Sequence, residues 1–335
     1  MSRNKFAAIE RRIERLWYGQ SRVAVLALPL AWLYRSLVFL RRIAYRTGLL
    51  KSRRCGVPVV VVGNITVGGT GKTPLVAWIA DRMAAEGRKV GILSRGYGGI
   101  ASGGPLIVTR DSPVSDVGDE ALLLARQTAA IVCVGADRVA GARRLARDAA
   151  VDLIVCDDGL QHYRLDRDLE IAVVDGDRGL GNGWLLPAGP LREPARRLEE
   201  VDLVFVNGGS GERREHRFDL RPRPARSLIG AKERELEEFR GQRVWAVAGI
   251  GNPERFAAML RAAGMKPLVP EVADHGTLSL EALRDERAWP ILMTSKDAVK
   301  YPATSIGDAW CVPVEIDMPA PDESALMNSL RELYV

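Results

Sequence analysis

The stretch Val59–Pro74 reads VVVVGNITVGGTGKTP, and it decides the fold class of the chain around it. Four consecutive β-branched residues are typical of a strand that is buried on both faces of a parallel sheet. The glycines that follow allow a tight turn and a close approach to an anion, because no Cβ blocks it. Gly71-Lys-Thr stands where a helix would begin, and Pro74 suits the first turn because it needs no intrahelical donor. The stretch therefore predicts a strand, a phosphate-binding loop (P-loop) and a helix, in that order.

In a P-loop, backbone N–H groups and the helix N-terminus surround the phosphates of a nucleotide. Lys72 is expected to reach the β- and γ-phosphates, and the Thr73 hydroxyl to bind Mg²⁺. The usual spacing GxxxxGK(S/T) places its first glycine where this chain has Thr66. The alternative, a glycine turn with an incidental lysine, is disfavoured because strand, loop and helix follow in the required order. The predicted nucleotide-binding residues are Thr66, Val67, Gly68, Gly69, Thr70, Gly71, Lys72 and Thr73.

A second apolar run, Leu153–Cys156, ends in two adjacent carboxylates, Asp157 and Asp158. Apolar strand residues that lead into an acidic residue are typical of the element that brings a carboxylate to the P-loop magnesium. Two neighbouring carboxylates at a strand end are costly unless they are paired or bind a metal. We therefore expect Thr73, Asp157 and Asp158 to hold Mg²⁺, with His162 as a candidate to support them. A solvated loop is the alternative.

Apolar runs alternate with helical segments from residue 57 onward, which predicts an α/β fold with a parallel sheet covered on both faces. Gly208–Pro224 is polar and rich in Gly, Arg and Pro, and we interpret it as a boundary. The predicted division is a basic amphipathic segment (1–54), a P-loop domain (55–207) and a smaller α/β domain (208–335), whose terminal helix can pack back on the first domain. The predicted strands are Val57–Val62, Val90–Leu93, Ile131–Val134, Leu153–Cys156, Ile171–Val174, Leu203–Val206, Val244–Ala248, Pro290–Thr294 and Trp310–Val314, and the predicted helices are Pro74–Glu86, Glu120–Gln127, Val139–Ala149, Glu254–Ala263, Leu280–Arg287 and Glu323–Leu333.

The basic residues are concentrated at the N-terminus. Residues 1–54 contain 13 Lys/Arg and two acidic residues, a net charge of +11, so residues 55–335 carry −5 of the total of +6. This distribution favours an anionic surface met by one end of the chain over a nucleic-acid groove. The apolar stretch Val23–Tyr34 is shorter than the ~20 residues that span a bilayer. We expect a membrane-interface helix with Arg and Lys at the head groups; a soluble helical lid over the core is the alternative.

The four cysteines are scattered, without a CxxC pair or a metal-ligand spacing. Cys133 and Cys156 lie inside apolar runs, where a thiol usually acts as a small core residue. A reducing, cytosolic environment is the simpler interpretation.

Further blocks carry a resemblance to a known family. They are Ile92–Gly99 (ILSRGYGG), Val117–Glu120 (VGDE), Cys156–Arg164 (CDDGLQHYR), Gly181–Gly183 (GNG), Leu186–Pro194 (LPAGPLREP), Gly249–Phe256 (GIGNPERF), Ala273–His275 (ADH) and Met293–Lys300 (MTSKDAVK). With the P-loop, these blocks resemble the tetraacyldisaccharide 4′-kinase family over nearly the whole chain. One departure is Ser295, where an acidic residue is common in the family, and it leaves the role of that loop open.

The resemblance implies that the γ-phosphate of ATP is transferred to the 4′-hydroxyl of tetraacyldisaccharide 1-phosphate, giving lipid IVA in lipid A biosynthesis. It implies an anionic glycolipid as substrate and a place on the cytoplasmic face of the bacterial inner membrane, and it indicates no nucleic acid and no obligate protein partner. Asp119 resembles the family's catalytic aspartate, and His275 resembles the histidine that pairs with it. The alternatives are a helix N-cap for Asp119 and an ordinary loop histidine for His275.

Two other classes of protein compete with a kinase. A regulatory P-loop GTPase is disfavoured because no (N/T)KxD element is present; Ser295-Lys-Asp lacks the spacing. A membrane-tethering module with a degenerate nucleotide site is disfavoured by the intact Gly71-Lys-Thr and by Asp157 and Asp158.

Overall fold

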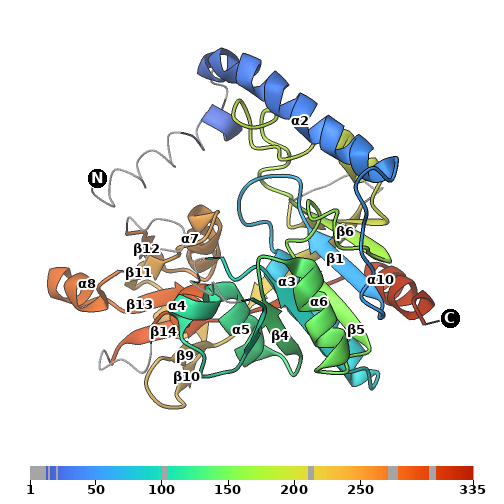
Figure 1. Ribbon diagram of the computed structural model, residues 1–335. Coiled ribbons are helices and arrows are strands. Elements are labelled where there is room, and N and C mark those ends of the chain that lie inside the picture. Colours follow the sequence, from blue (N-terminus) through green and yellow to red (C-terminus); the bar gives the residue numbers. More distant parts are fainter. Residues whose placement is uncertain are drawn as a thin grey trace. The chain divides into compact units, whose positions relative to one another are not determined.

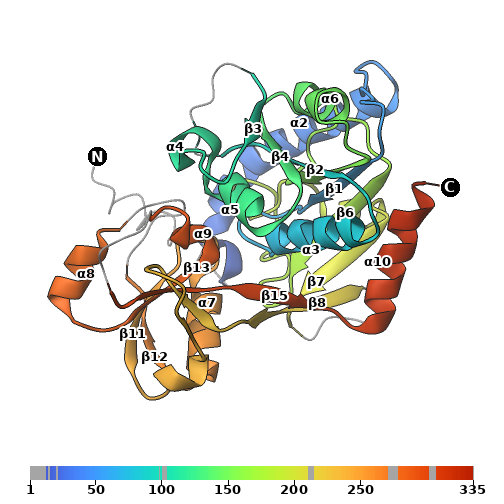
Figure 2. The ribbon, with the colours of Figure 1, turned by 90° about the horizontal axis from the view of Figure 1, so that it is seen from below.

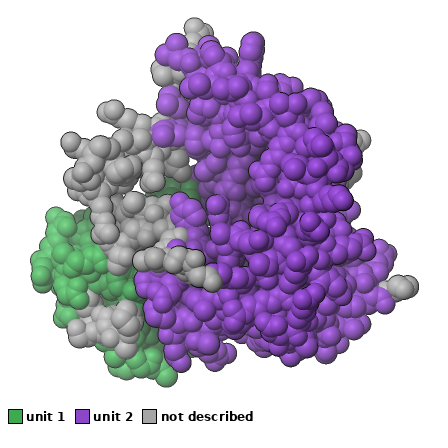
Figure 3. Space-filling view, in the orientation of Figure 1, with its two compact units in different colours: residues 1–11, 220–315 green, residues 12–219, 316–335 purple. Residues whose placement is uncertain are grey.

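The computed structural model describes residues 13, 16–19, 22–97, 99, 104–209, 215–270, 278–301 and 307–334. The chain divides into two compact units, which Figure 3 shows in different colours. The larger unit comprises residues 12–219 and 316–335, and the described part of the smaller unit lies within residues 220–315. Both are α/β with mostly parallel strands, which confirms the predicted fold class.

The larger unit is built on a sheet that has nine strands in the described chain. Their order across the sheet is β15 (Val314–Asp317), β8 (His216–Pro222), β7 (Leu203–Asn207), β6 (Leu169–Asp175), β1 (Val59–Gly63), β5 (Leu153–Asp157), β2 (Val90–Ser94), β4 (Ile131–Val134) and β3 (Leu106–Val108). The strands from β8 to β4 pair in parallel, and β3 pairs antiparallel to β4. Every residue of β1, β2 and β5 is buried, as expected for apolar runs that are covered on both faces.

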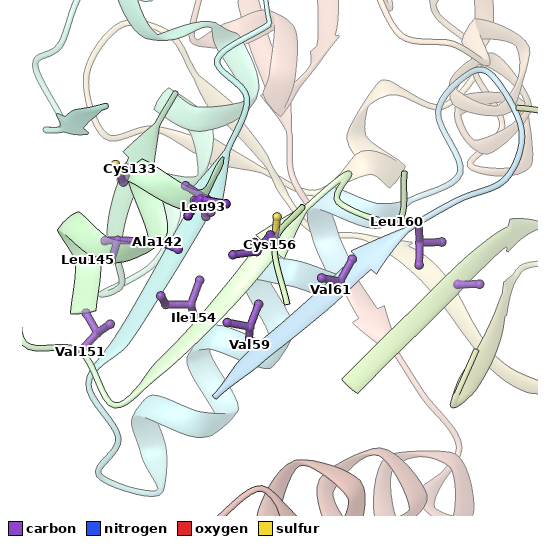
Figure 4. Packing of buried hydrophobic residues seen from close by; sticks show 13 residues of the cluster. Val59, Val61, Leu93, Cys133, Ala142, Leu145, Val151, Ile154, Cys156 and Leu160 are labelled. Atoms are coloured by element: carbon purple, nitrogen blue, oxygen red, sulfur yellow. The ribbon is translucent and has the colours of Figure 1, made fainter. Parts of the chain in front are cut away.

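Helices cover both faces of this sheet (Figures 1 and 2). Figure 2 shows α6 (Arg138–Arg147) on one side, and α3 (Lys72–Ala85) and α5 (Asp119–Gln127) on the other. Leu145 of α6 packs in one cluster with Val59, Ile154 and Cys156, side chains that Figure 4 shows together. Cys133 and Cys156 are fully buried, so the prediction of small core residues is confirmed. Further helices in the described part of this unit are η1 (Arg22–Ala27), α2 (Leu28–Arg46), α4 (Val114–Val117), η2 (Ala195–Glu199) and α10 (Ala320–Glu332).

The smaller unit has a sheet of six strands among the described residues. Their order is β10 (Glu233–Arg234), β9 (Ala225–Ser227), β14 (Ala309–Val312), β13 (Ile291–Thr294), β11 (Arg243–Val247) and β12 (Lys266–Leu268), with η3 (Leu236–Phe239), α7 (Pro253–Ala262), α8 (Leu280–Glu286) and α9 (Ser295–Ala298). Buried Asp297 accepts hydrogen bonds from the Gly249 N–H and from Lys300 Nζ, both at 2.9 Å. This carboxylate therefore joins the GIGNPERF and MTSKDAVK blocks.

One sequence interpretation needs correction and another needs detail. The polar stretch Gly208–Pro224, interpreted as a boundary, contains the border between the two units, after Asp219, and it also contains strand β8, which pairs in parallel with β7. Only Phe218 of β8 is buried, so its composition gives little strand signal. The predicted strand Trp310–Val314 is two strands, because Pro313 between them has no N–H to donate.

Candidate functional site

The P-loop leaves β1 at Gly63 and enters α3 at Lys72. Gly68 and Gly71 have φ values of 110° and 93°, in the left-handed region that favours glycine. A Cβ on Gly71 would lie 2.3 Å from the Asn207 side-chain nitrogen. The path of the loop therefore requires glycine at this position, as the sequence predicted.

Residues of the LPAGPLREP block hold the first half of the P-loop. Val67 donates its N–H to the Pro190 carbonyl at 2.8 Å, and Arg192 donates its N–H to the Ile65 carbonyl at 2.7 Å. Thr66 forms an antiparallel bridge with Leu191 between these two bonds. The first half of the loop is thus paired with residues 190–192 in the manner of two short antiparallel strands.

The second half of the P-loop is held at Thr70. Asn207, at the end of β7, donates its side-chain N–H to the Thr70 carbonyl at 3.0 Å. The Thr70 hydroxyl is buried without a hydrogen-bond partner among the described residues. Buried polar groups are normally satisfied, so this hydroxyl is available to a ligand.

The last residue of β5, Asp157, lies beside the start of α3. Its Oδ2 accepts a hydrogen bond from the Thr73 hydroxyl at 3.3 Å, and its Oδ1 is buried without a partner within the described chain. Burial, with the nearby charge of Glu120, raises the pKa of Asp157 to about 7. An oxygen of this kind suits a cation, which would supply the missing interaction and favour the ionised form.

The pKa of the next carboxylate, Asp158, is shifted in the opposite direction. It adopts a φ of 52°, and its oxygens lie 3.5 Å from Lys72 Nζ and 3.0 Å from Arg192 Nη1. Partial burial acts to raise the pKa of Asp158, but the charges of Lys72 and Arg192 outweigh it and hold this pKa well below its usual range. The structure therefore brings together four residues predicted from the sequence: Lys72, Thr73, Asp157 and Asp158.

The predicted catalytic aspartate, Asp119, is buried at the start of α5 in the same unit. It is the first residue of the helix, whereas Gly118 occupies the N-cap position, so Asp119 is not the N-cap of this helix. Its Oδ1 accepts a hydrogen bond from the Glu120 N–H at 2.9 Å. The other predicted catalytic residue, His275, lies outside the described residues.

His162, the histidine considered for support of the metal site, lies near arginine side chains. Burial, with the charges of Arg138 and Arg167, lowers the pKa of His162 to about 4. Its Nε2 is buried and has no hydrogen-bond partner among the described residues. His162 is therefore neutral at physiological pH. His216, in the polar stretch, lies on β8 with its Nδ1 2.9 Å from Asp322 Oδ1.

Three further groups support the site without having been assigned a role from the sequence. Arg192 binds Asp158, as described above. Buried Arg138 donates from Nη2 to the Asp157 carbonyl at 3.0 Å. Gln161 donates from Nε2 to both the Asn64 carbonyl and Glu193, at 3.0 Å each. Arg192 and Gln161 stand in blocks quoted for the resemblance, which was the available signal; Arg138 stands just before the predicted helix Val139–Ala149 and had no such signal.

Helix α2 packs on the larger unit through a few side chains, among them Ala31, Tyr34 and Arg42, and it exposes most of its large apolar residues. Tyr34 is half-buried, Arg42 is buried and forms an ion pair with Glu200, and the Tyr45 ring lies 5.7 Å from the Tyr163 ring. The exposed large apolar side chains of this helix are Leu30, Trp32, Leu33, Leu37, Phe39, Leu40 and Ile43. This is the reverse of a soluble helix that packs an apolar face on a core.

Within the described chain, Ala24–Arg46 is the helical stretch whose length of 23 residues and apolar composition would allow it to cross a membrane. Length and composition are weak evidence when they come from a single helix near an N-terminus. The small buried share of its side chains separates it from an ordinary core helix.

Comparisons with known proteins agree with this geometry. The sequence pattern of the family described as tetraacyldisaccharide-1-P 4′-kinase matches residues 23–334. The tetraacyldisaccharide 4′-kinase of Alkalilimnicola ehrlichii is 50% identical over 91% of this chain and 92% of its own length. The enzyme of the same name from Pseudomonas putida is 44% identical over 96% of this chain and 97% of its own length.

A solved structure extends the likeness to the fold. The crystal structure of LpxK from Aquifex aeolicus in complex with ATP matches with a TM-score of 0.75 and 26% sequence identity. The match covers 93% of this chain and 100% of that one. The resemblance found in the sequence is therefore confirmed: the chain belongs to the tetraacyldisaccharide-1-P 4′-kinase family.

Proposed function

We propose that this chain uses ATP to phosphorylate the 4′-hydroxyl of a tetraacylated disaccharide 1-phosphate, the reaction of its family, through the residues gathered at the P-loop. The supporting observation is the contact of Thr73 with Asp157 and of Lys72 with Asp158, beside a P-loop braced at both ends. In phosphoryl transfer, positioning and charge neutralisation supply most of the catalysis. These residues offer both.

The residues present fit a magnesium ion. We propose that Thr73 and Asp157 hold Mg²⁺, with Asp158 beside them, because the free Oδ1 of Asp157 is a buried acceptor that lacks a partner among the described residues. Mg²⁺ prefers oxygen ligands, and when bound it would neutralise negative charge on the phosphates of ATP. Lys72 and Arg192 are held by Asp158 at positions from which they can bind phosphate oxygens.

The acceptor oxygen attacks the γ-phosphorus, the bond from that phosphorus to the β–γ bridging oxygen breaks, and ADP leaves. The proton of the 4′-hydroxyl must pass to a base. We propose Asp119 for this role, with His275 as its partner, on the resemblance of the VGDE and ADH blocks. A buried carboxylate at the start of α5 is a suitable acceptor for this proton.

We also propose that α2 attaches the enzyme to the cytoplasmic face of the inner membrane. Its exposed apolar side chains are accompanied by Arg35, Arg41, Arg46 and, just after the helix, Lys51 and Arg53. Apolar residues flanked by basic ones bind anionic bilayers. An acylated, phosphorylated acceptor resides in such a bilayer, so attachment brings enzyme and substrate to one surface.

The proposal is tested with purified protein, γ-labelled ATP, Mg²⁺ and the tetraacylated disaccharide 1-phosphate in mixed micelles. We expect label to enter the lipid only when all components are present. Label released solely as inorganic phosphate, at the same rate with and without the lipid, would instead identify a hydrolytic nucleotide switch.

A further inference from the structure

Helix α2 contacts the residue that connects the P-loop to Asp158. The Tyr34 hydroxyl donates a hydrogen bond to the main-chain carbonyl of Arg192 at 3.1 Å. The N–H of Arg192 binds the P-loop at the Ile65 carbonyl, and its guanidinium binds Asp158. Arg192 thus joins three parts of the larger unit: α2, the P-loop and the end of β5.

A second contact of the same helix reaches the other supporting block. Arg41 Nη2 donates to the Gln161 carbonyl at 3.4 Å. The Gln161 side chain in turn donates to the Asn64 carbonyl, at the start of the P-loop. Two residues of α2, Tyr34 and Arg41, are therefore bonded to the two segments that hold the loop and its carboxylates.

The hydrogen bond from Tyr34 is made to a main-chain carbonyl, so its effect is on the orientation of the main chain. A hydrogen bond to a carbonyl fixes the orientation of its peptide plane, and the direction of the Arg192 side chain depends on that plane. Catalytic geometry tolerates little displacement, since an error of ~1 Å can cost about 100-fold in rate. Without the hydroxyl, the Arg192 carbonyl would lose the donor that α2 supplies.

We propose that Tyr34 is a positioning residue for phosphoryl transfer: its hydroxyl fixes the main chain at Arg192, so that α2 is part of the scaffold of the phosphate site as well as a membrane contact. The proposal rests on the proposed function, because it requires that Arg192 and Asp158 act where the phosphates bind. The exposed apolar side chains of the helix meet lipid, whereas Tyr34 and Arg41 bond to the segments that hold the site.

The test compares Tyr34→Phe with Tyr45→Phe. Both substitutions remove one hydroxyl from the same helix, and in Tyr45 it is the ring that makes the contact with Tyr163. Rates are expressed per mole of bound nucleotide, so that loss of folded protein does not lower them. We expect Tyr34→Phe to reduce kcat about threefold to tenfold, the equivalent of one net hydrogen bond, while Tyr45→Phe keeps the wild-type rate.

The KM for ATP and flotation with anionic liposomes should stay within about twofold of wild type in both variants, since neither the P-loop backbone nor the apolar face is changed. A structural role alone would lower thermal stability without changing kcat per nucleotide site. Hydrogen–deuterium exchange gives a second readout: the amides of Leu191 and Arg192 should exchange faster in Tyr34→Phe, and those of β4 should not. A wild-type kcat for Tyr34→Phe overturns the proposal, and so does unchanged exchange at Leu191 and Arg192.

A double-mutant cycle with Arg192→Ala tests whether Tyr34 acts through the Arg192 side chain. If Tyr34 acts through Arg192, Tyr34→Phe should have no further effect on kcat once the Arg192 side chain is gone. Losses that multiply in the double variant overturn the proposal. Lys72→Ala is measured alongside: an active Lys72→Ala rejects the proposed function, whereas an inactive Lys72→Ala beside a wild-type Tyr34→Phe rejects only this inference.

Discussion

The Thr73 hydroxyl donates a hydrogen bond to the Asp157 carboxylate at 3.3 Å, which joins the start of α3 to the end of β5 across 84 residues of sequence. The second carboxylate oxygen has no partner among the described residues, although it is buried. Asp158, the next residue, is paired with Lys72 and Arg192 instead. The two adjacent carboxylates therefore differ: Asp158 is paired with cationic side chains, whereas Asp157 keeps one buried oxygen that fits the proposed magnesium ion.

This division predicts different defects in two variants. Asp157→Asn should raise the Mg²⁺ concentration at half-maximal rate by about tenfold to 100-fold, because a metal ligand loses its charge. Asp158→Asn should mainly lower kcat at saturating Mg²⁺, because Lys72 and Arg192 lose the carboxylate that orients them. Initial rates over a series of Mg²⁺ concentrations check both. Identical Mg²⁺ curves for wild type and Asp157→Asn would contradict the assignment.

The strand, loop and helix at Val59–Pro74 and the acidic end of β5 were predictable because each signal is local. β-branched runs, glycines and a helix start are adjacent in the chain, so no tertiary information is needed. The part played by Arg192 was not predictable in this way. It depends on the register in which residues 190–192 meet Ile65–Val67, and that register is set by the fold.

Strand β8 and the orientation of α2 were likewise not predictable from the sequence alone. Strand β8 has only one short alternation of apolar and polar residues, Phe218-Asp-Leu-Arg, inside a polar stretch, and only Phe218 of the strand is buried. In α2 the apolar residues are frequent enough to give no single clear face. The contacts of Tyr34 and Arg42 decide which side is inward, and neither contact has a sequence signature.

The shifted pKa of His162 predicts an acid sensitivity. Because its pKa is lowered from about 6.5 in the unfolded chain to about 4 in the folded protein, the folded state disfavours its protonation. Its contribution to stability is present above pH ~6.5 and is lost as the pH falls toward ~4. Over this pH range, we expect the free energy of unfolding of His162→Gln to fall by about 1–3 kcal/mol less than that of wild type. The expected difference is smaller than the full pKa shift would give, because the His162 side chain is partly exposed.

The measurement for His162 is the free energy of urea unfolding at several pH values between 7.5 and 4. The difference between His162→Gln and wild type should shift in favour of the variant as the pH falls. A difference that stays constant over this range would mean that His162 titrates as it does in the unfolded chain.

The membrane proposal predicts that exposed apolar positions of α2 respond differently from an exposed apolar position elsewhere in the chain. Leu33→Glu and Leu37→Glu place a charge on side chains of α2 that are 59% and 58% exposed, so binding to anionic liposomes should fall steeply, since each apolar contact is worth about 1.5–3 kcal/mol. The matched control is Leu268→Glu, at a position that is 47% exposed in the smaller unit. Flotation that is equally reduced, or equally unaffected, in all three variants would exclude α2 as the attachment site.

The proposed base predicts non-additive losses. Asp119→Ala and His275→Ala should each lower kcat by about 100-fold or more with little change in ATP affinity, because general-base catalysis contributes at that scale. The double variant should be barely slower than the slower single one, since residues that act as a unit are not additive. Fully multiplicative losses, or a wild-type rate for His275→Ala, would leave Asp119 without this partner.

The central claim is that this P-loop delivers the ATP γ-phosphate to a lipid acceptor. The most direct measurement is single-turnover transfer of labelled phosphate to the tetraacylated disaccharide 1-phosphate by wild type, Lys72→Ala and Lys89→Ala, each verified as folded. Lys89 is an exposed lysine just before β2 and serves as the control. We predict 4′-labelled lipid from wild type and Lys89→Ala at rates within about twofold, and a rate at least about 100-fold lower from Lys72→Ala. Transfer by Lys72→Ala at more than about a tenth of the wild-type rate would contradict the account.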